Sequence, residues 1–173
     1  MLSKNMIDAL NKQIEEEFYS ANLYLAMASW CDKEGLSNSA TFLFNHFEEE
    51  SSHALKIFHY VNEMGGHAIV PNIKQPPVEY KSIHQVFEDT YQHEVYITAK
   101  IHELVRLAIE ESDYATNNFL QWFVEEQREE EATFQEILSI LKLIGSGSSN
   151  LYFIEQEIAK LSTKAQGMDA QAK

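Results

Sequence analysis

Four glutamates interrupt the apolar rows of this chain in a way that indicates metal chemistry. Each lies near the middle of a long helical pattern with large apolar residues one turn to either side, and they are Glu17, Glu50, Glu94 and Glu130. His53 follows Glu50 by three residues and therefore projects from nearly the same helix face. Buried carboxylates without partners would lose their hydration and repel one another, so they require either cations or protons.

The basic residues do not provide this counter-charge. Arg106 and Arg128 are the only arginines, and Arg128 points away from the Glu130 row. Lys56 and Lys100 also lie on other helix faces than the four glutamates. A metal is the better partner, because four carboxylates and one imidazole can hold two hard or borderline ions that share bridging carboxylates. Such ligands favour Fe(III) over Fe(II), so we hypothesise that the site binds two ferrous ions and that dioxygen oxidises them.

Long helical patterns position these residues. The first covers residues 3–32 with Ser3 as its N-cap, and the second covers residues 37–64 with Ser37 or Ser39 as its N-cap. Three prolines in residues 66–82 exclude a regular helix there, and a segment of that length can travel along a whole bundle. Helices two and three are therefore expected to be parallel.

The second half of the chain completes the fold. Ser82 caps a third helix, a short turn around Ser112-Asp113 follows, and the fourth helix ends near Ile144. We predict one all-α domain over residues 1–173, with a single long crossover between helices two and three. Its parts are a four-helix bundle over about 3–145, a short fifth C-terminal helix over about 150–161 and a mobile tail over 162–173.

Composition excludes several classes of function. The formal net charge of −14 leaves no basic patch for nucleic acid, and it favours cations as guests. Cys31 is the only cysteine, so disulfides within the chain and Cys-x-x-Cys metal knuckles are impossible. The opening residues are too polar for a signal peptide, and no apolar run approaches the length of a membrane span. We expect a soluble cytoplasmic protein with no nucleic-acid or membrane partner.

Several motifs together resemble the bacterial non-haem ferritins over about residues 1–161. They are Glu17 with Tyr24, Glu49-Glu50-x-x-His53, Glu94, and Phe119-Leu120-Gln121-Trp122 leading into Glu126-Gln127-x-Glu129-Glu130-Glu131. The short fifth helix after a Gly-rich break also fits this family. The resemblance implies iron storage with ferroxidase activity, in which Fe(II) is oxidised by dioxygen or peroxide. It also implies a hollow homo-oligomeric shell of 24 subunits that stores ferric oxyhydroxide.

The same resemblance implies roles for individual residues. It assigns one iron of a di-iron centre to Glu17, Glu50 and His53, and the second to Glu50, Glu94 and Glu130, with Glu50 bridging. Gln127 and Tyr24 would lie beside the pair, contacting oxygen species or accepting an electron. By pattern alone, Tyr24 equally fits an ordinary core tyrosine. A third iron site would comprise Glu49, Glu126 and Glu129, with Glu130.

Differences from related families narrow the choice of family. A bacterioferritin has a second Glu-x-x-His on the fourth helix and a methionine where this chain has Ser51, whereas here the fourth helix carries Gln127-x-x-Glu130. Haem is therefore not expected. Two alternatives stay open: a di-iron oxidase or oxygenase that acts on an organic substrate, and a structural bundle with solvated acids. His46 lies one turn before Glu50 on the same row and could be a second imidazole ligand, but the family motif does not use it, so it is expected to pack beside the site or to support a ligand. The surface histidines are expected to be His59, His67, His84, His93 and His102.

Overall fold

Five α-helices form the described part of the chain, which comprises residues 1–145 and 147–169 of a computed structural model. They are α1 (Lys4–Lys33), α2 (Ser37–Glu63), α3 (Ile83–Glu110), α4 (Tyr114–Ile144) and α5 (Leu151–Asp169), the last preceded by a 3₁₀ turn, Ser148–Asn150. The predicted all-α bundle is therefore confirmed. Among the described helices, none has the combination of length and apolar character that crossing a membrane requires.

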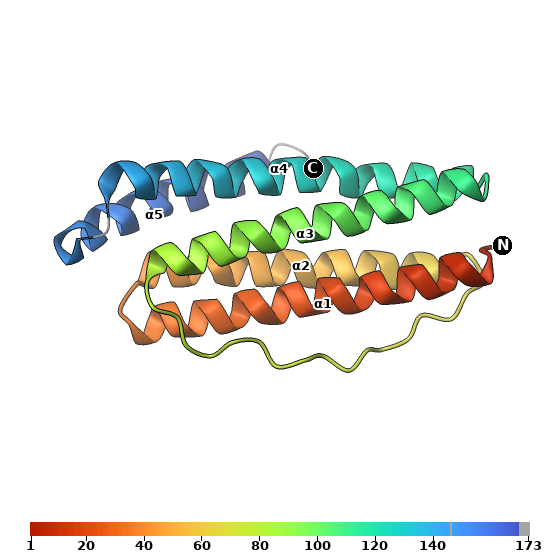
Figure 1. Ribbon diagram of the computed structural model, residues 1–173, viewed down its shortest axis with the longest axis horizontal. Coiled ribbons are helices and arrows are strands. Elements are labelled where there is room, and N and C mark those ends of the chain that lie inside the picture. The colour runs from red at the N-terminus through yellow and green to blue at the C-terminus, as the bar shows by residue number, and fades with distance from the viewer. Residues whose placement is uncertain (146, 170–173) are drawn as a thin grey trace.

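Two helical hairpins pack side by side to make the bundle. α1 packs antiparallel to α2, α3 packs antiparallel to α4, and the crossover between them runs along the length of the bundle (Figure 1). α2 and α3 consequently run in the same direction, as predicted. Gly35 and Gly65 end the first two helices with positive φ angles of 78° and 81°, a conformation that glycine adopts without strain.

The helix N-termini are capped in two different ways. The side chains of Ser3, Ser82 and Asp113 accept hydrogen bonds from backbone N–H groups of the first turns of α1, α3 and α4. The predicted Ser37 or Ser39 cap of α2 is wrong, because the N-cap position is Leu36, which supplies no side-chain oxygen.

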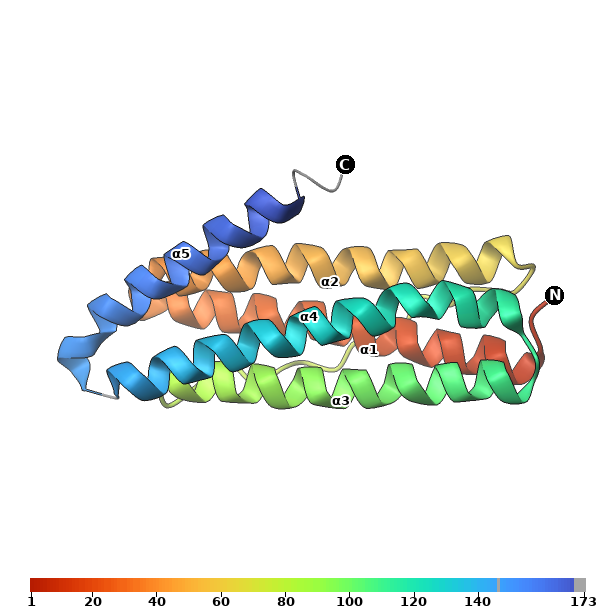
Figure 2. The same ribbon diagram turned by 90° about the horizontal axis from the view of Figure 1, so that it is seen from above.

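Glu155 of α5 provides the cap that α2 lacks. Its carboxylate accepts hydrogen bonds from the backbone N–H groups of Asn38 and Ser39 at 2.7 and 3.1 Å and from the Ser39 hydroxyl. A negative group here also complements the positive end of the helix dipole. α5 lies obliquely across α2 (Figure 2), with Ile154 and Ile158 buried beneath it.

The fifth helix is longer than predicted. It continues to Asp169 rather than ending near residue 161, because no proline interrupts residues 151–169. The predicted boundary between helix and tail at residue 162 is thus wrong. Residues 170–173 of the predicted tail lie outside the described residues.

Glu155→Ala should loosen α5. Loss of an N-cap typically costs about 1 kcal/mol, so we expect a lower thermal unfolding midpoint and faster amide hydrogen exchange in α5 and the first turn of α2. Glu157→Ala is the matched control, because Glu157 lies on the same helix and its carboxylate accepts a hydrogen bond from Lys160 of the following turn. Equal hydrogen exchange in both variants would show that Glu155 does not hold the helix.

The acidic residues divide the apolar core into two parts. One cluster surrounds Phe42, Phe87 and Phe134 near α5, and the other surrounds Leu10 and Ile57 toward the opposite end. Between them all four long helices contribute a buried polar layer that comprises Gln13, Glu17, Ser20, His46, Glu50, His53, Thr90, Glu94, Gln127 and Glu130. The bundle therefore surrounds a polar site at mid-length rather than an uninterrupted apolar core.

Candidate metal centre

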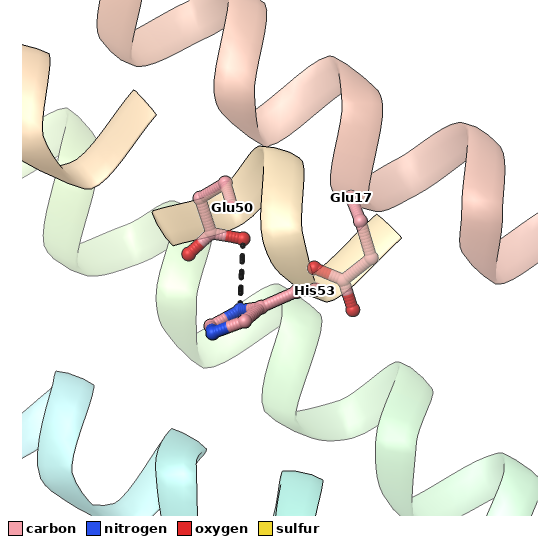
Figure 3. Close-up of side chains that lie close together, drawn as sticks. All are labelled: Glu17, Glu50 and His53. Atoms are coloured by element: carbon pink, nitrogen blue, oxygen red, sulfur yellow. Dashed lines mark ion pairs between the residues drawn. The ribbon is translucent and has the colours of Figure 1, made fainter. Parts of the chain in front are cut away.

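Glu17, Glu50 and His53 converge in the middle of the bundle. Glu17 comes from α1 and the other two come from α2 (Figure 3), and one potential ligand atom from each lies within 4.8 Å of the others. The three residues are only 1–2% exposed, and His53 Nδ1 lies 3.5 Å from Glu50 Oε2. The spacing of three residues on α2 places carboxylate and imidazole one above the other. Two carboxylates and an imidazole so placed are a ligand set for a divalent ion.

Glu94 of α3 and Glu130 of α4 occupy the same buried layer from the other side. Tyr24 donates its hydroxyl hydrogen to Glu94, and Gln127 Nε2 donates to Glu94 Oε2 at 2.9 Å. Tyr24 is thus both a core residue and a direct partner of a site carboxylate. Glu94 belongs to none of the three potential ligand groups that the described residues form at this spacing, whereas Glu130 belongs to one.

Glu49 links the two remaining groups. It forms one with His53 and Glu126, and the other with His46 and Glu130. His46 is buried as expected, and its Nε2 lies 3.6 Å from Glu130 Oε2. Glu129, which the sequence placed beside Glu49 and Glu126, instead points to the surface, where it lies 3.5 Å from Arg128. Of the residues predicted for the third site, Glu49 therefore lies close to Glu126 in one group and to Glu130 in another, whereas Glu129 belongs to neither group.

Three site carboxylates each have one buried oxygen without a hydrogen-bond partner. Among the described side chains, the buried oxygens without a partner include Glu17 Oε2, Glu50 Oε1 and Glu130 Oε2. A buried, unsatisfied acceptor costs free energy, and it is tolerated where a further partner completes the site. All three oxygens face the polar layer, so bound cations would satisfy them.

Burial and crowding shift the pKa values of these groups. Burial, reinforced by the negative charge of Glu50, raises the pKa of Glu17 well above its usual range. Burial and Glu130 do the same to the pKa of Glu94. The pKa of Glu49 rises to about 7, mainly through burial and then the charge of Glu130. Without metal, the layer therefore retains protons that a cation would displace.

The two buried histidines of α2 and the nearby carboxylates shift one another's pKa values. Burial opposes a charge on either ring, yet nearby carboxylates outweigh it and raise the pKa of His46 and of His53 to about 9. Burial would raise the pKa of Glu50 as well, but its contact with His53 reverses the sign and lowers it. The metal-free site thus balances its negative charge with imidazolium groups and protonated carboxyls.

Two residues that support the site were not predicted. Gln13, 2% exposed, donates from Nε2 to Glu17 Oε1 at 2.8 Å. His93, predicted to lie at the surface, is instead partly buried, with its Nε2 2.7 Å from the Ser20 hydroxyl and its ring edge-on to Tyr24. Burial lowers the pKa of His93 to about 4. A polar residue one turn before a buried glutamate was the available signal for Gln13.

The outcome for the remaining histidines is mixed. His59, His67 and His102 are exposed, as predicted, whereas His84 is partly buried. Neither of the partly buried rings, His84 and His93, belongs to a potential ligand group among the described residues.

Gln13→Leu should weaken metal binding without unfolding the bundle. Leucine fills a similar volume but leaves Glu17 Oε1 without its donor, and loss of a residue that orients a ligand typically costs about 10–100-fold in metal affinity. Titration with Zn²⁺, which is not oxidised, measures this change. Gln92→Leu is the control, because Gln92 makes a similar amide-to-carboxylate contact with Glu88 at the surface. Equal affinity in the two variants would contradict the positioning role of Gln13.

Comparison with known proteins gives this geometry its context. The sequence model of the ferritin-like domain family matches residues 7–144 of this chain. The chain belongs to the ferritin family. It is 49% identical over 165 residues to a probable bacterial non-heme ferritin-like protein of Haemophilus influenzae, covering 95% of this chain and 100% of that relative. It is 47% identical to the bacterial non-heme ferritin of Campylobacter jejuni, covering 94% and 97% of the two chains.

Solved ferritin structures share the fold as well as the sequence. An open-pore ferritin from Archaeoglobus fulgidus superposes with a TM-score of 0.88 at 45% identity, covering 91% of this chain and 96% of that one. The buried polar layer, with its convergent carboxylates from four helices, is therefore found here in a ferritin subunit.

Proposed function

We propose that this chain is a subunit of an iron-storage shell and that it oxidises Fe(II) at a di-iron centre in the middle of its own bundle. The observation that supports this most directly is the set of buried, unpartnered oxygens on Glu17, Glu50 and Glu130. Among the ion pairs of the described residues, none joins a lysine or arginine to these three glutamates, and ferritin membership makes iron the expected metal. Iron is here the substrate and the cargo.

In this proposal, the two ligand sets are those that the resemblance to bacterial non-haem ferritins implies. Glu17, Glu50 and His53 hold one ion, while Glu50, Glu94 and Glu130 hold the second, so Glu50 bridges the two. Tyr24 and Gln127 orient Glu94 by donating hydrogen bonds to it. Hard carboxylate oxygens stabilise Fe(III) relative to Fe(II), which favours loss of one electron from each ion to dioxygen or peroxide.

A third ion would bind next to this pair. Glu49 and Glu126 already lie close to one another and to His53, and Glu130 lies near Glu49. Glu129 would join them only after leaving its contact with Arg128. Ions passing from here could enter the cavity where ferric oxyhydroxide accumulates.

Exposed apolar side chains support assembly into a shell. The crossover exposes Ile69, Val70 and Val78 by 55%, 79% and 62%, and the start of α5 exposes Leu151, Tyr152 and Phe153. Apolar surface of this kind marks contacts between proteins. We propose a homo-oligomer of 24 subunits located in the cytoplasm.

Iron loading tests the function. Excess Fe(II) is added in air, the product is separated by size-exclusion chromatography, and iron per chain is measured in the protein peak. Iron far above the roughly two ions that one bundle site can hold, in a particle much larger than the chain, is the expected result. About two ions per chain would instead indicate a di-iron enzyme acting on another substrate. No bound iron would indicate a structural bundle.

A further inference from the structure

A hydrogen bond between α3 and α4 lies directly beside the metal centre. The Thr98 hydroxyl of α3 donates its hydrogen to Glu131 Oε1 of α4 at 2.6 Å, a distance typical of a hydroxyl that donates to a carboxylate. Both side chains are partly buried. Neither belongs to any of the potential ligand groups that the described residues form. Any effect of this pair on the site must therefore pass through a neighbouring side chain.

Gln127 is that neighbour. Its Nε2 lies 3.4 Å from Thr98 Oγ1, 2.9 Å from Glu94 Oε2 and 3.4 Å from the backbone oxygen of Glu94. Thr98 follows Glu94 by four residues on α3, so the two share a helix face. Glu131 follows Gln127 by four residues on α4 in the same way. The two faces meet at the Gln127 amide.

The hydrogen of Thr98 decides which way round the Gln127 amide lies. A hydroxyl has one hydrogen, and because Glu131 takes it, Thr98 Oγ1 can only accept from other groups. The backbone oxygen of Glu94 also only accepts. The amide nitrogen of Gln127, which has two hydrogens to donate, fits between these acceptors. The reversed amide would place its oxygen against two oxygens that offer it no hydrogen.

The orientation of this amide matters for Glu94. With its nitrogen toward Glu94, Gln127 donates to Oε2 while Tyr24 donates to Oε1. Donors of this kind fix the direction of a carboxylate that binds metal and strengthen it as a ligand. With its oxygen toward Glu94, Gln127 would instead repel the carboxylate and leave it free to turn away. The side chains that fix Gln127 therefore influence a carboxylate of the metal centre.

We propose that Thr98 and Glu131 are positioning residues for Fe(II) oxidation. Glu131 holds the Thr98 hydroxyl as an acceptor, and Thr98 in turn fixes the Gln127 amide so that its nitrogen donates to Glu94. Neither Thr98 nor Glu131 is itself a ligand, and both act through Gln127. The inference rests on the proposed function, because Glu94 is a ligand of the second ion only in that proposal.

Neutron diffraction tests the orientation directly. Crystals of the unaltered protein are exchanged into D₂O, and the deuterium atoms on Thr98 and Gln127 are located. We expect the Thr98 deuterium to point at Glu131 Oε1, and the Gln127 atom that faces Glu94 to carry two deuterium atoms. A Thr98 deuterium directed at Gln127, or an amide oxygen facing Glu94, would overturn the inference. The experiment needs no variant, so it decides the matter even if a substituted chain does not fold.

Substitution of Thr98 tests the effect on the site. Thr98→Val keeps the branched shape but removes the hydroxyl, so we expect the initial rate of Fe(II) oxidation and the affinity for Zn²⁺ to fall about tenfold. Thr98→Ser, which keeps the hydroxyl, should retain both. Glu131→Leu, which removes the acceptor of the Thr98 hydrogen, should lower both. Thr41→Val is the matched control and should change neither, because the exposed Thr41 hydroxyl bonds to the backbone of its own helix.

A double substitution separates positioning from a general effect on packing. If Thr98 acts through Gln127, Thr98→Val should cause no further loss in a Gln127→Leu background. An additive loss, or an unchanged rate and zinc affinity in Thr98→Val alone, would overturn the inference and leave the proposed function intact. Failure of the unaltered chain to oxidise Fe(II) would overturn both.

Discussion

Glu50→Gln should lower the initial rate of Fe(II) oxidation by about 100-fold or more. Loss of a residue that merely orients a metal ligand already costs about 10–100-fold, and Glu50 is the proposed ligand common to both ions. Glutamine keeps the size of the side chain but removes the charge and the ability to bridge two ions. The measurement is the appearance of Fe(III) absorbance after rapid mixing of Fe(II) with aerated protein at about two ions per chain.

Glu48→Gln is the matched control for this variant. Glu48 is the preceding residue on α2, but it is exposed to solvent, so its replacement should leave the rate unchanged. Circular dichroism and size-exclusion chromatography of both variants would establish that the fold and the assembly persist. Oxidation as fast in Glu50→Gln as in the unaltered protein would rule out the bridging role.

Metal binding should strengthen steeply with pH. The pKa of His46 and of His53 is about 9 in the metal-free chain, and burial raises the pKa of Glu17 and Glu94 well above the usual range. These groups therefore hold protons near neutral pH, and a metal must displace those protons before it can bind. At a pH below the pKa of a ligand group, each proton that the metal displaces makes the apparent affinity rise about tenfold for every unit of pH. Displacement of two protons therefore makes the apparent affinity rise about 100-fold per pH unit.

Calorimetry with Zn²⁺ measures both consequences. The apparent affinity for Zn²⁺ is determined at about pH 6, 7 and 8, where the two buried histidines still hold their protons in the metal-free chain. The proton count comes from repeating each titration in buffers with different heats of ionisation. His102→Gln, which changes an exposed ring, should release the same number of protons as the unaltered chain. Heats independent of the buffer, together with a flat affinity profile, would contradict proton displacement.

Much of the fold could be predicted because its signals are local. Helical periodicity, the glycines after α1 and α2, and the prolines of the crossover each act over a few residues, and the structure agrees with them. The buried glutamates could be recognised from the sequence because their signal is local too. Glu17, Glu50, Glu94 and Glu130 occupy apolar positions in their own helices, whatever lies opposite, and the structure places all four in one buried layer.

The departures at the α2 cap and at His93 depend on contacts between distant segments. Asn38 and Ser39 obtain their cap from Glu155, more than a hundred residues away, so local rules wrongly assigned it to a serine. His93 is partly buried because Ser20 and Tyr24 of α1 contact it. Glu129 points to Arg128 at the surface because its position on α4 faces away from the neighbouring helices.

The sequence by itself determined the helices, their connectivity and the buried acidic residues that indicate a metal site, since these follow from periodicity and from the cost of burying charge. Only the tertiary structure decided which atoms share a cation. A ligand set is fixed by the directions of side chains across helices, and packing sets these directions. That is why Glu49 lies between two potential sites and why His46, which the family motif does not use, lies 3.6 Å from an oxygen of Glu130.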